Sequence, residues 1–177
     1  MRRIAVVGQS GTGKTTLARR LADRLDAESI DLDALYHGPG WTPAPTAEFR
    51  QRVLAATQCS SWVVSGNYPT VSDLVQGRAD TIVWLDLARW RTLPRRSIVR
   101  ALTRRELWNG NRERWRDLLS RDPERNPIVW SWQSQPKLCE RFETFAGGSF
   151  WARADVHRLR TPGQVRAFLA GVDRDDR

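Results

Sequence analysis

Residues 8–15 of the chain read Gly-Gln-Ser-Gly-Thr-Gly-Lys-Thr. A short apolar run, residues 4–7, comes directly before this stretch, and a segment with apolar residues at helical spacing follows it. A glycine-rich loop between a buried strand and a helix is typical of an α/β fold. The stretch therefore decides the fold class and places the first strand and the first helix on either side of it.

The same stretch matches the pattern G-x-x-x-x-G-K-T, a Walker A loop. Its glycines let backbone N–H groups turn inward around an anion, and the helix that follows points its positive end at the phosphates. Lys14 can bridge the β- and γ-phosphates of a nucleotide, and the Thr15 hydroxyl can ligate Mg²⁺. The pattern predicts a binding site for ATP and Mg²⁺ made by Gly8, Ser10, Gly11, Thr12, Gly13, Lys14, Thr15 and Thr16.

Strand-like and helix-like segments alternate along the rest of the chain. The predicted strands are residues 3–7, 29–32, 62–65, 81–87 and 156–160, and the predicted helices are residues 15–25, 47–57, 137–145 and 162–169. Alternation of this kind predicts one mostly parallel five-stranded sheet with helices on both faces. A length of 177 residues fits a single domain.

Composition narrows the class of protein further. The chain is 40% hydrophobic, yet no apolar run approaches the ~18 residues that a membrane helix needs. The apolar run at residues 4–7 is too short for a signal peptide. Cys59 and Cys139 stand far apart, so we expect reduced thiols, no zinc site and a cytoplasmic protein that does not enter a membrane.

Two carboxylates follow the second predicted strand. If that strand is extended through residue 33, Asp31 and Asp33 share one face and point toward the carboxyl edge of the sheet, where open α/β sheets bind ligands. We assign Asp31 to the metal, and Asp33 to the acceptor as the base that takes its proton. The alternative is that Asp33 only caps the following turn.

Further candidates lie after other strands. Tyr36 and Trp41 follow the second strand, Asn67 and Tyr68 follow the third, and all four are predicted to form the acceptor site, where aromatic rings could stack on a flat substrate. For Trp41 and Tyr68, simple packing is the alternative, and His37 is assigned no catalytic role. Asp86 ends the most apolar strand, where it either orders a magnesium-bound water or caps the next helix.

Positive charge is concentrated in one segment. The net charge is +9, and residues 89–125 hold twelve arginines against five acidic residues. Arg96, Arg100 and Arg104 repeat every four residues, which places them on one helix face. Such a face suits the transition state of a triphosphate, and the alternatives are a helix lying along DNA phosphates or a solvated basic face.

Taken in chain order, the Walker A loop, Asp31-Leu32-Asp33-Ala34-Leu35-Tyr36, Pro39-Gly40-Trp41, Gly66-Asn67-Tyr68 and Leu85-Asp86-Leu87 resemble the DNA topology modulation proteins over roughly residues 1–140. These are P-loop proteins related to adenylate kinase and close in layout to shikimate and gluconate kinases. The resemblance implies the P-loop NTPase fold with strand order 2-3-1-4-5. It also implies an arginine-rich helical lid at about residues 89–135, with Arg96 and Arg100 acting on ATP. Related sequences tend to carry Asp where this chain has Ser65.

Three functions follow from these features. The favoured one is an ATP-dependent small-molecule kinase of adenylate-kinase type, which transfers the γ-phosphoryl group to an unidentified acceptor and uses Lys14, Asp33, Arg96 and Arg100 in catalysis. The second is a nucleotide-dependent DNA-binding regulator, motivated by the arginine segment. The third is a nucleotide switch with weak turnover, motivated by Ser65.

Overall fold

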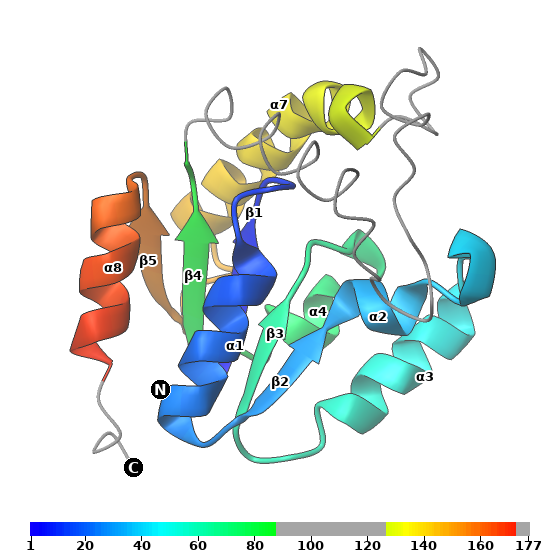
Figure 1. The fold of residues 1–177 in the computed structure, drawn as a ribbon, viewed down its shortest axis with the longest axis horizontal. Helices are drawn as coiled ribbons and strands as arrows, with labels where there is room; N and C mark the ends of the chain where they lie inside the picture. The colour runs from blue at the N-terminus through cyan, green and yellow to red at the C-terminus, as the bar shows by residue number, and fades with distance from the viewer. Residues whose placement is uncertain (88–126, 173–177) are drawn as a thin grey trace.

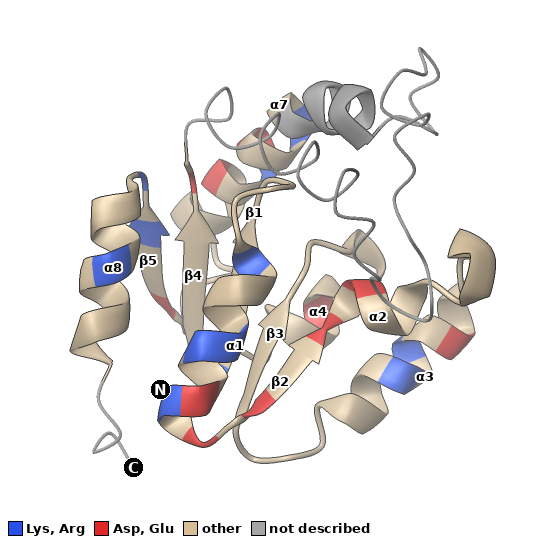
Figure 2. Cartoon of the chain, viewed as in Figure 1, with Lys and Arg blue, Asp and Glu red and all other residues tan. Residues whose placement is uncertain are grey.

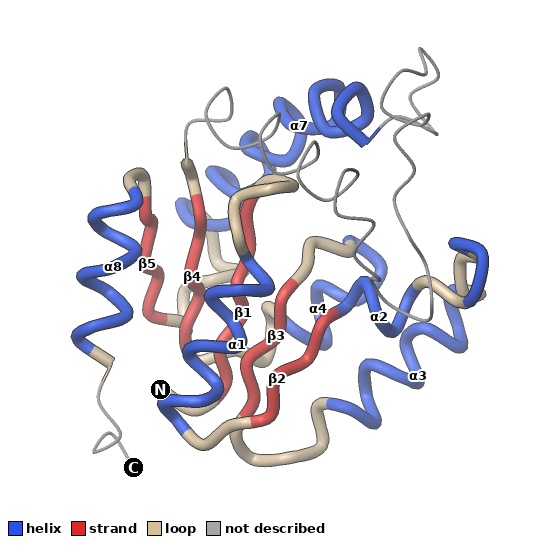
Figure 3. Tube along the Cα trace, viewed as in Figure 1, coloured by secondary structure: helices blue, strands red, loops and turns tan. Residues whose placement is uncertain are grey.

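The computed structural model describes residues 1–87 and 127–172, with side chains omitted for residues 127–135. Its centre is a parallel sheet of five strands, β1 (Arg3–Gly8), β2 (Glu28–Asp31), β3 (Trp62–Ser65), β4 (Thr81–Leu85) and β5 (Asp155–Leu159). The strands lie in the order β2-β3-β1-β4-β5, as Figures 1 and 3 show. The predicted fold class and strand order are therefore confirmed.

Helices cover both faces of the sheet (Figure 1). The longer helices are α1 (Lys14–Leu25), α3 (Thr46–Ala56), α7 (Pro127–Gly147) and α8 (Pro162–Gly171). Shorter elements are α2 (Leu32–Tyr36), α4 (Ser72–Val75) and the 3-10 turns η1 (Pro39–Trp41) and η2 (Pro69–Val71). Among the described helices, none has both the length and the apolar character required to cross a bilayer.

The core divides into two layers because successive side chains of each strand point to opposite faces. One layer joins α1 and α8 to the sheet through residues such as Leu17, Leu21 and Val83. The other contains Phe49 from α3 and Phe142 from α7, packed around Trp62, Trp84 and Trp151. All three of these Trp side chains are buried, so the segment before β5 packs in the same layer as β3 and β4.

Several predicted boundaries are wrong; the strand predicted at residues 81–87, for example, ends at Leu85. β2 ends at Asp31 rather than at residue 32, because the Asp31 side chain accepts a hydrogen bond from the Asp33 backbone N–H and starts α2. α3 begins at Thr46 and ends at Ala56, one residue earlier at each end than the predicted helix at residues 47–57. α7 runs from Pro127 to Gly147 and contains Pro136, so it begins ten residues before the predicted helix at residues 137–145.

Gly66 directly follows β3, at the point where the chain leaves the sheet. Its φ is +139°, and a Cβ added there would stand 2.7 Å from the Cβ of Leu32, which is buried. Replacing Gly66 with alanine should lower the free energy of unfolding by about 1–3 kcal/mol, measured by urea denaturation. Gly171→Ala is the matched control, because nothing lies within 4 Å of the added methyl group. Equal stability of the two variants would contradict the prediction.

Candidate active site

The Walker A loop lies at the carboxyl end of β1 and leads into α1. Gly8, Gly11 and Gly13 all have positive φ, between 76° and 139°, a backbone conformation that glycine adopts without strain. α1 has no side-chain cap and no acidic residue in its first turn. The loop therefore has the backbone shape of a phosphate cradle, and neither a capping side chain nor an acidic first turn competes with an anion for the amino end of α1.

Hydrogen bonds to the Gln9 backbone oxygen connect residues within the Walker A loop. The Lys14 Nζ donates to the backbone oxygen of Gln9 at 2.9 Å, and the Thr12 hydroxyl donates to the same oxygen at 2.8 Å. The Gln9 side chain is buried, and its Nε2 lies 3.5 Å from the Sγ of Cys139 on α7. The loop is therefore in contact with the first helix that the structure describes after β4.

Asn67 fastens the β3 loop to the Walker A loop. Its Oδ1 accepts from the Gly8 backbone N–H at 3.1 Å, and its Nδ2 donates to the Gly8 backbone oxygen. Both polar groups of the Asn67 side chain are thus hydrogen-bonded to the backbone of Gly8, the first glycine of the motif. The predicted contact of Asn67 with the acceptor stays a prediction, and the sequence alone did not reveal its contact with Gly8.

Replacing Asn67 with aspartate should weaken the loop. The change keeps an acceptor for the Gly8 N–H, but it places a carboxylate oxygen against the Gly8 carbonyl oxygen and removes the donor. We expect the free energy of unfolding to fall by about 1–3 kcal/mol, measured by urea denaturation, together with weaker ATP binding. Gln58→Ala, which removes an exposed amide, is the control. A stable Asn67→Asp variant with unchanged ATP affinity would refute this role.

The two aspartates after β2 are positioned differently from the prediction. Asp31 ends the strand and caps α2, whereas Asp33 lies in the first turn of that helix and not in an extended segment. The argument that both share one face of a strand is therefore wrong. The alternative role as a cap belongs to Asp31, not Asp33. Both residues nevertheless lie at the carboxyl edge of the sheet, and Figure 2 shows acidic positions at the end of β2 and in α2.

Tyr68 connects the β3 loop to Asp33. Its hydroxyl donates to the Asp33 Oδ1 at 2.6 Å and lies 3.4 Å from the Nε2 of His37. Burial, followed by the negative charge of Asp33, raises the pKa of Tyr68 well above its usual value. Tyr68 therefore stays protonated at neutral pH and acts as a hydrogen-bond donor to the carboxylate.

Aromatic rings surround this contact. The ring of Tyr36 lies 4.7 Å from that of Tyr68 and 5.1 Å from that of Phe49, measured between centroids. Trp41 extends the group through His37, at 5.3 Å, and is 37% exposed. The structure thus brings Asp33, Tyr36, Trp41 and Tyr68 together, as predicted from their strand ends. His37, to which the sequence gave no role, lies between them.

Asp86 follows β4 and faces β5. Its Oδ2 accepts from the Arg158 Nε at 2.9 Å, and the Arg158 Nη2 also pairs with Glu143 at 2.6 Å. The Arg158 guanidinium lies 4.0 Å from the centre of the Trp84 ring. Asp86 thereby holds an arginine at the carboxyl edge, a contact that spacing could not reveal. Its role in ordering a magnesium-bound water stays a prediction.

Other predicted site residues lie outside the described part of the chain. Arg96, Arg100 and most of the predicted lid fall within residues 88–126, and Arg104 does as well. Within residues 1–87 and 127–172, no group of three or more His, Cys, Asp or Glu side chains is arranged to hold a metal ion.

Several solved structures are similar to this chain. A shikimate kinase from Acinetobacter baumannii in complex with shikimate has 16% sequence identity and a TM-score of 0.51, over 96% of this chain and 89% of that one. An unliganded sugar kinase from Janibacter sp. HTCC2649 has 18% identity and a TM-score of 0.46, over 98% and 96% of the two chains. A shikimate kinase from Bacteroides thetaiotaomicron has 16% identity and a TM-score of 0.47, over 96% and 94%.

No protein-family model matches the chain, and neither does any curated protein sequence. The resemblance to the DNA topology modulation proteins therefore stays a prediction. The comparison with the Acinetobacter structure, together with the observed strand order, shows that this chain has the P-loop kinase fold.

Proposed function

We propose that this chain is an ATP-dependent small-molecule kinase, which moves the γ-phosphoryl group of Mg-ATP to an acceptor bound beside Asp33. One observation carries the proposal. The Walker A loop and Asp33 lie at the same edge of the sheet, and two consecutive residues connect them: Asn67 bonds to Gly8 of the loop, and Tyr68 bonds to Asp33. In-line transfer needs the donor phosphate and the acceptor to be held together in this way.

The residues at the loop fit Mg-ATP. The glycines with positive φ leave room for the phosphates, and Lys14 would place its charge on the β- and γ-oxygens. Thr15 and Asp31 would hold Mg²⁺, because hydroxyl and carboxylate oxygens are its usual protein ligands. When bound, the ion neutralises charge that develops on the phosphates.

The acceptor side favours a hydroxyl over a phosphate. Its described residues are the Asp33 carboxylate, the His37 imidazole and a set of aromatic rings. A carboxylate repels a phosphate but accepts the proton of a hydroxyl. The two arginines of the adjacent α3 already have partners: Arg50 pairs with Asp73, and Arg52 pairs with Glu48. This argues for a polyol, sugar or hydroxy acid as the acceptor and departs from the adenylate-kinase type that the resemblance implied.

The experiment is ADP release from Mg-ATP by the purified protein, measured with separate panels of sugars, small hydroxy acids, nucleosides and nucleoside monophosphates. Stimulation by one hydroxyl-bearing class would support the proposal. Stimulation by nucleoside monophosphates alone would restore the adenylate-kinase type. Turnover that requires duplex DNA, or tight ATP binding without turnover under any condition, would favour the regulator or the switch instead.

A further inference from the structure

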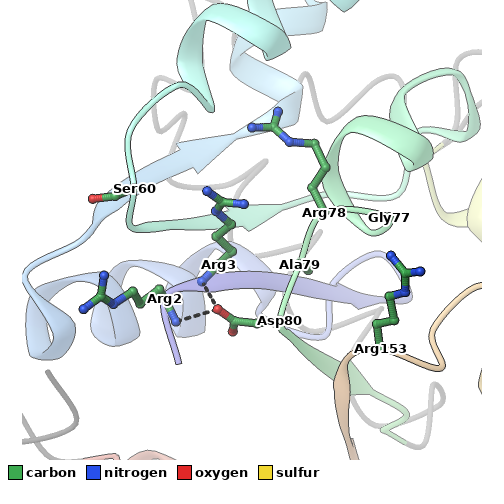
Figure 4. A pocket seen from close by; sticks show the side chains of 8 residues that line it. All are labelled: Arg2, Arg3, Ser60, Gly77, Arg78, Ala79, Asp80 and Arg153. Carbon is green, nitrogen blue, oxygen red and sulfur yellow. Dashed lines mark hydrogen bonds between the residues drawn. The ribbon is translucent and has the colours of Figure 1, made fainter.

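A hollow lies at the edge of the sheet opposite the candidate active site, where the strands begin. It has a volume of about 380 Å³ and is lined by Arg2, Arg3, Ser60, Gly77, Arg78, Ala79, Asp80 and Arg153, as Figure 4 shows. Arg3 begins β1 and Asp80 directly precedes β4, whereas the Walker A loop follows the other end of β1. The six residues of β1 span about 17 Å, so this basic pocket is separate from the candidate active site.

The single carboxylate of the basic pocket is already satisfied. The Asp80 Oδ2 accepts from the backbone N–H groups of Arg2 and Arg3, both at 2.9 Å. The Asp80 Oδ1 accepts from the Thr81 hydroxyl at 2.7 Å. Asp80 therefore organises the backbone at the start of β1 rather than pairing with an arginine side chain.

The guanidinium groups of the pocket have few partners of their own. Arg78 is held in place, because it donates to the Thr57 hydroxyl at 2.9 Å and to the Thr57 backbone oxygen at 3.1 Å. Neither of these partners is charged. Among the residues that the structure describes, no carboxylate pairs with the side chains of Arg2, Arg3 or Arg153. The pocket thus collects four positive charges against one negative charge that is turned to the backbone.

We propose that the basic pocket binds a small anion that carries two or more phosphate groups, as an inorganic or a nucleoside polyphosphate does. Four guanidinium groups around one hollow match the charge of such an anion, and those of Arg2, Arg3 and Arg153 can each donate two parallel hydrogen bonds to phosphate oxygens. Its volume lies in the range of small-molecule sites. Ala79 and Gly77 line it with little bulk, which favours a compact ligand over a duplex laid across the surface.

The test uses inorganic tripolyphosphate and isothermal titration calorimetry. Because the Walker A loop would bind the same probe, the pocket is titrated in the full chain carrying Lys14→Ala, and the wild-type protein is titrated for comparison. We expect binding at one remaining site. Adding Arg3→Ala and Arg153→Ala should weaken that binding at least tenfold, since each substitution removes charge-assisted hydrogen bonds.

A matched control removes the same charge elsewhere. Arg20 and Arg166 are exposed, on α1 and α8, and Arg20→Ala with Arg166→Ala should leave the affinity within about twofold. The thermal unfolding midpoint of every variant without anion checks that it is folded, and wild-type protein should show two sites, with one lost in the Arg3→Ala and Arg153→Ala variant. The proposal would be overturned if both pairs of substitutions lowered the affinity for tripolyphosphate equally, or if the Lys14→Ala protein bound no tripolyphosphate. It would also be overturned if the protein bound duplex DNA through these arginines but did not bind tripolyphosphate.

Discussion

Replacing Lys14 with alanine should reduce ATP-dependent turnover by a factor of at least about 10²–10³, while the protein stays folded. Under the proposed function, the ammonium group would place its positive charge on the β- and γ-phosphates. In the structure it donates to the Gln9 backbone oxygen at 2.9 Å. ADP formation with the best acceptor from the panel measures the effect on kcat. Urea denaturation shows whether the fold is intact.

Two further substitutions make this test specific. Lys137, the only other lysine, is exposed on α7, and Lys137→Ala should keep full activity. Lys14→Arg preserves the charge but replaces a compact ammonium with a planar fork, so activity should still be largely lost. Full turnover in Lys14→Ala would remove the Walker A loop from the chemistry and with it the proposed function.

Replacing Asp33 with asparagine should lower kcat by about 10²–10⁴-fold, with little change in the KM for ATP. The amide oxygen can still accept the hydrogen bond from the Tyr68 hydroxyl, so the local structure is preserved. The amide cannot take a proton from the acceptor, and only the chemical step is lost. Steady-state kinetics with saturating acceptor separate kcat from KM.

Tyr68 and Asp73 provide the comparisons for Asp33. Tyr68→Phe removes the donor that orients the carboxylate, and we expect a loss of about tenfold, smaller than that of Asp33→Asn. Asp73→Asn alters an exposed carboxylate paired with Arg50 and should leave activity unchanged. A fully active Asp33→Asn variant would show that the acceptor proton is not transferred to Asp33.

The fold could be predicted from the sequence because its signals are local. The apolar run before Gly8 and the alternation of strands and helices mark the sheet, whereas its strand order was implied by the resemblance to the DNA topology modulation proteins. The boundary between β2 and α2 escaped prediction because it depends on one hydrogen bond from the Asp33 N–H to the Asp31 side chain. A pattern of apolar residues carries no information about such a cap.

The candidate site could be predicted only in outline. Residues at strand ends meet at one edge of a parallel sheet, so Asp33 and Tyr68 could be expected to be neighbours. The contact of Asn67 with Gly8 joins residues that are distant in sequence, and an asparagine in a loop gives no sign of its partner. The basic pocket has no motif at all, since its four arginines come from three separate segments of the chain.

The position of β1 in the middle of the sheet has a consequence for folding during synthesis. This strand is made first, yet it pairs with β3 and β4, which lie far downstream. Its buried residues 4–7 must therefore wait for their first partner strand until residue 65 has left the ribosome, and for the second until residue 85 has. Non-local parallel pairing of this kind slows folding and exposes apolar strands to aggregation, so nascent chains truncated before β4 should need a chaperone to remain dispersed.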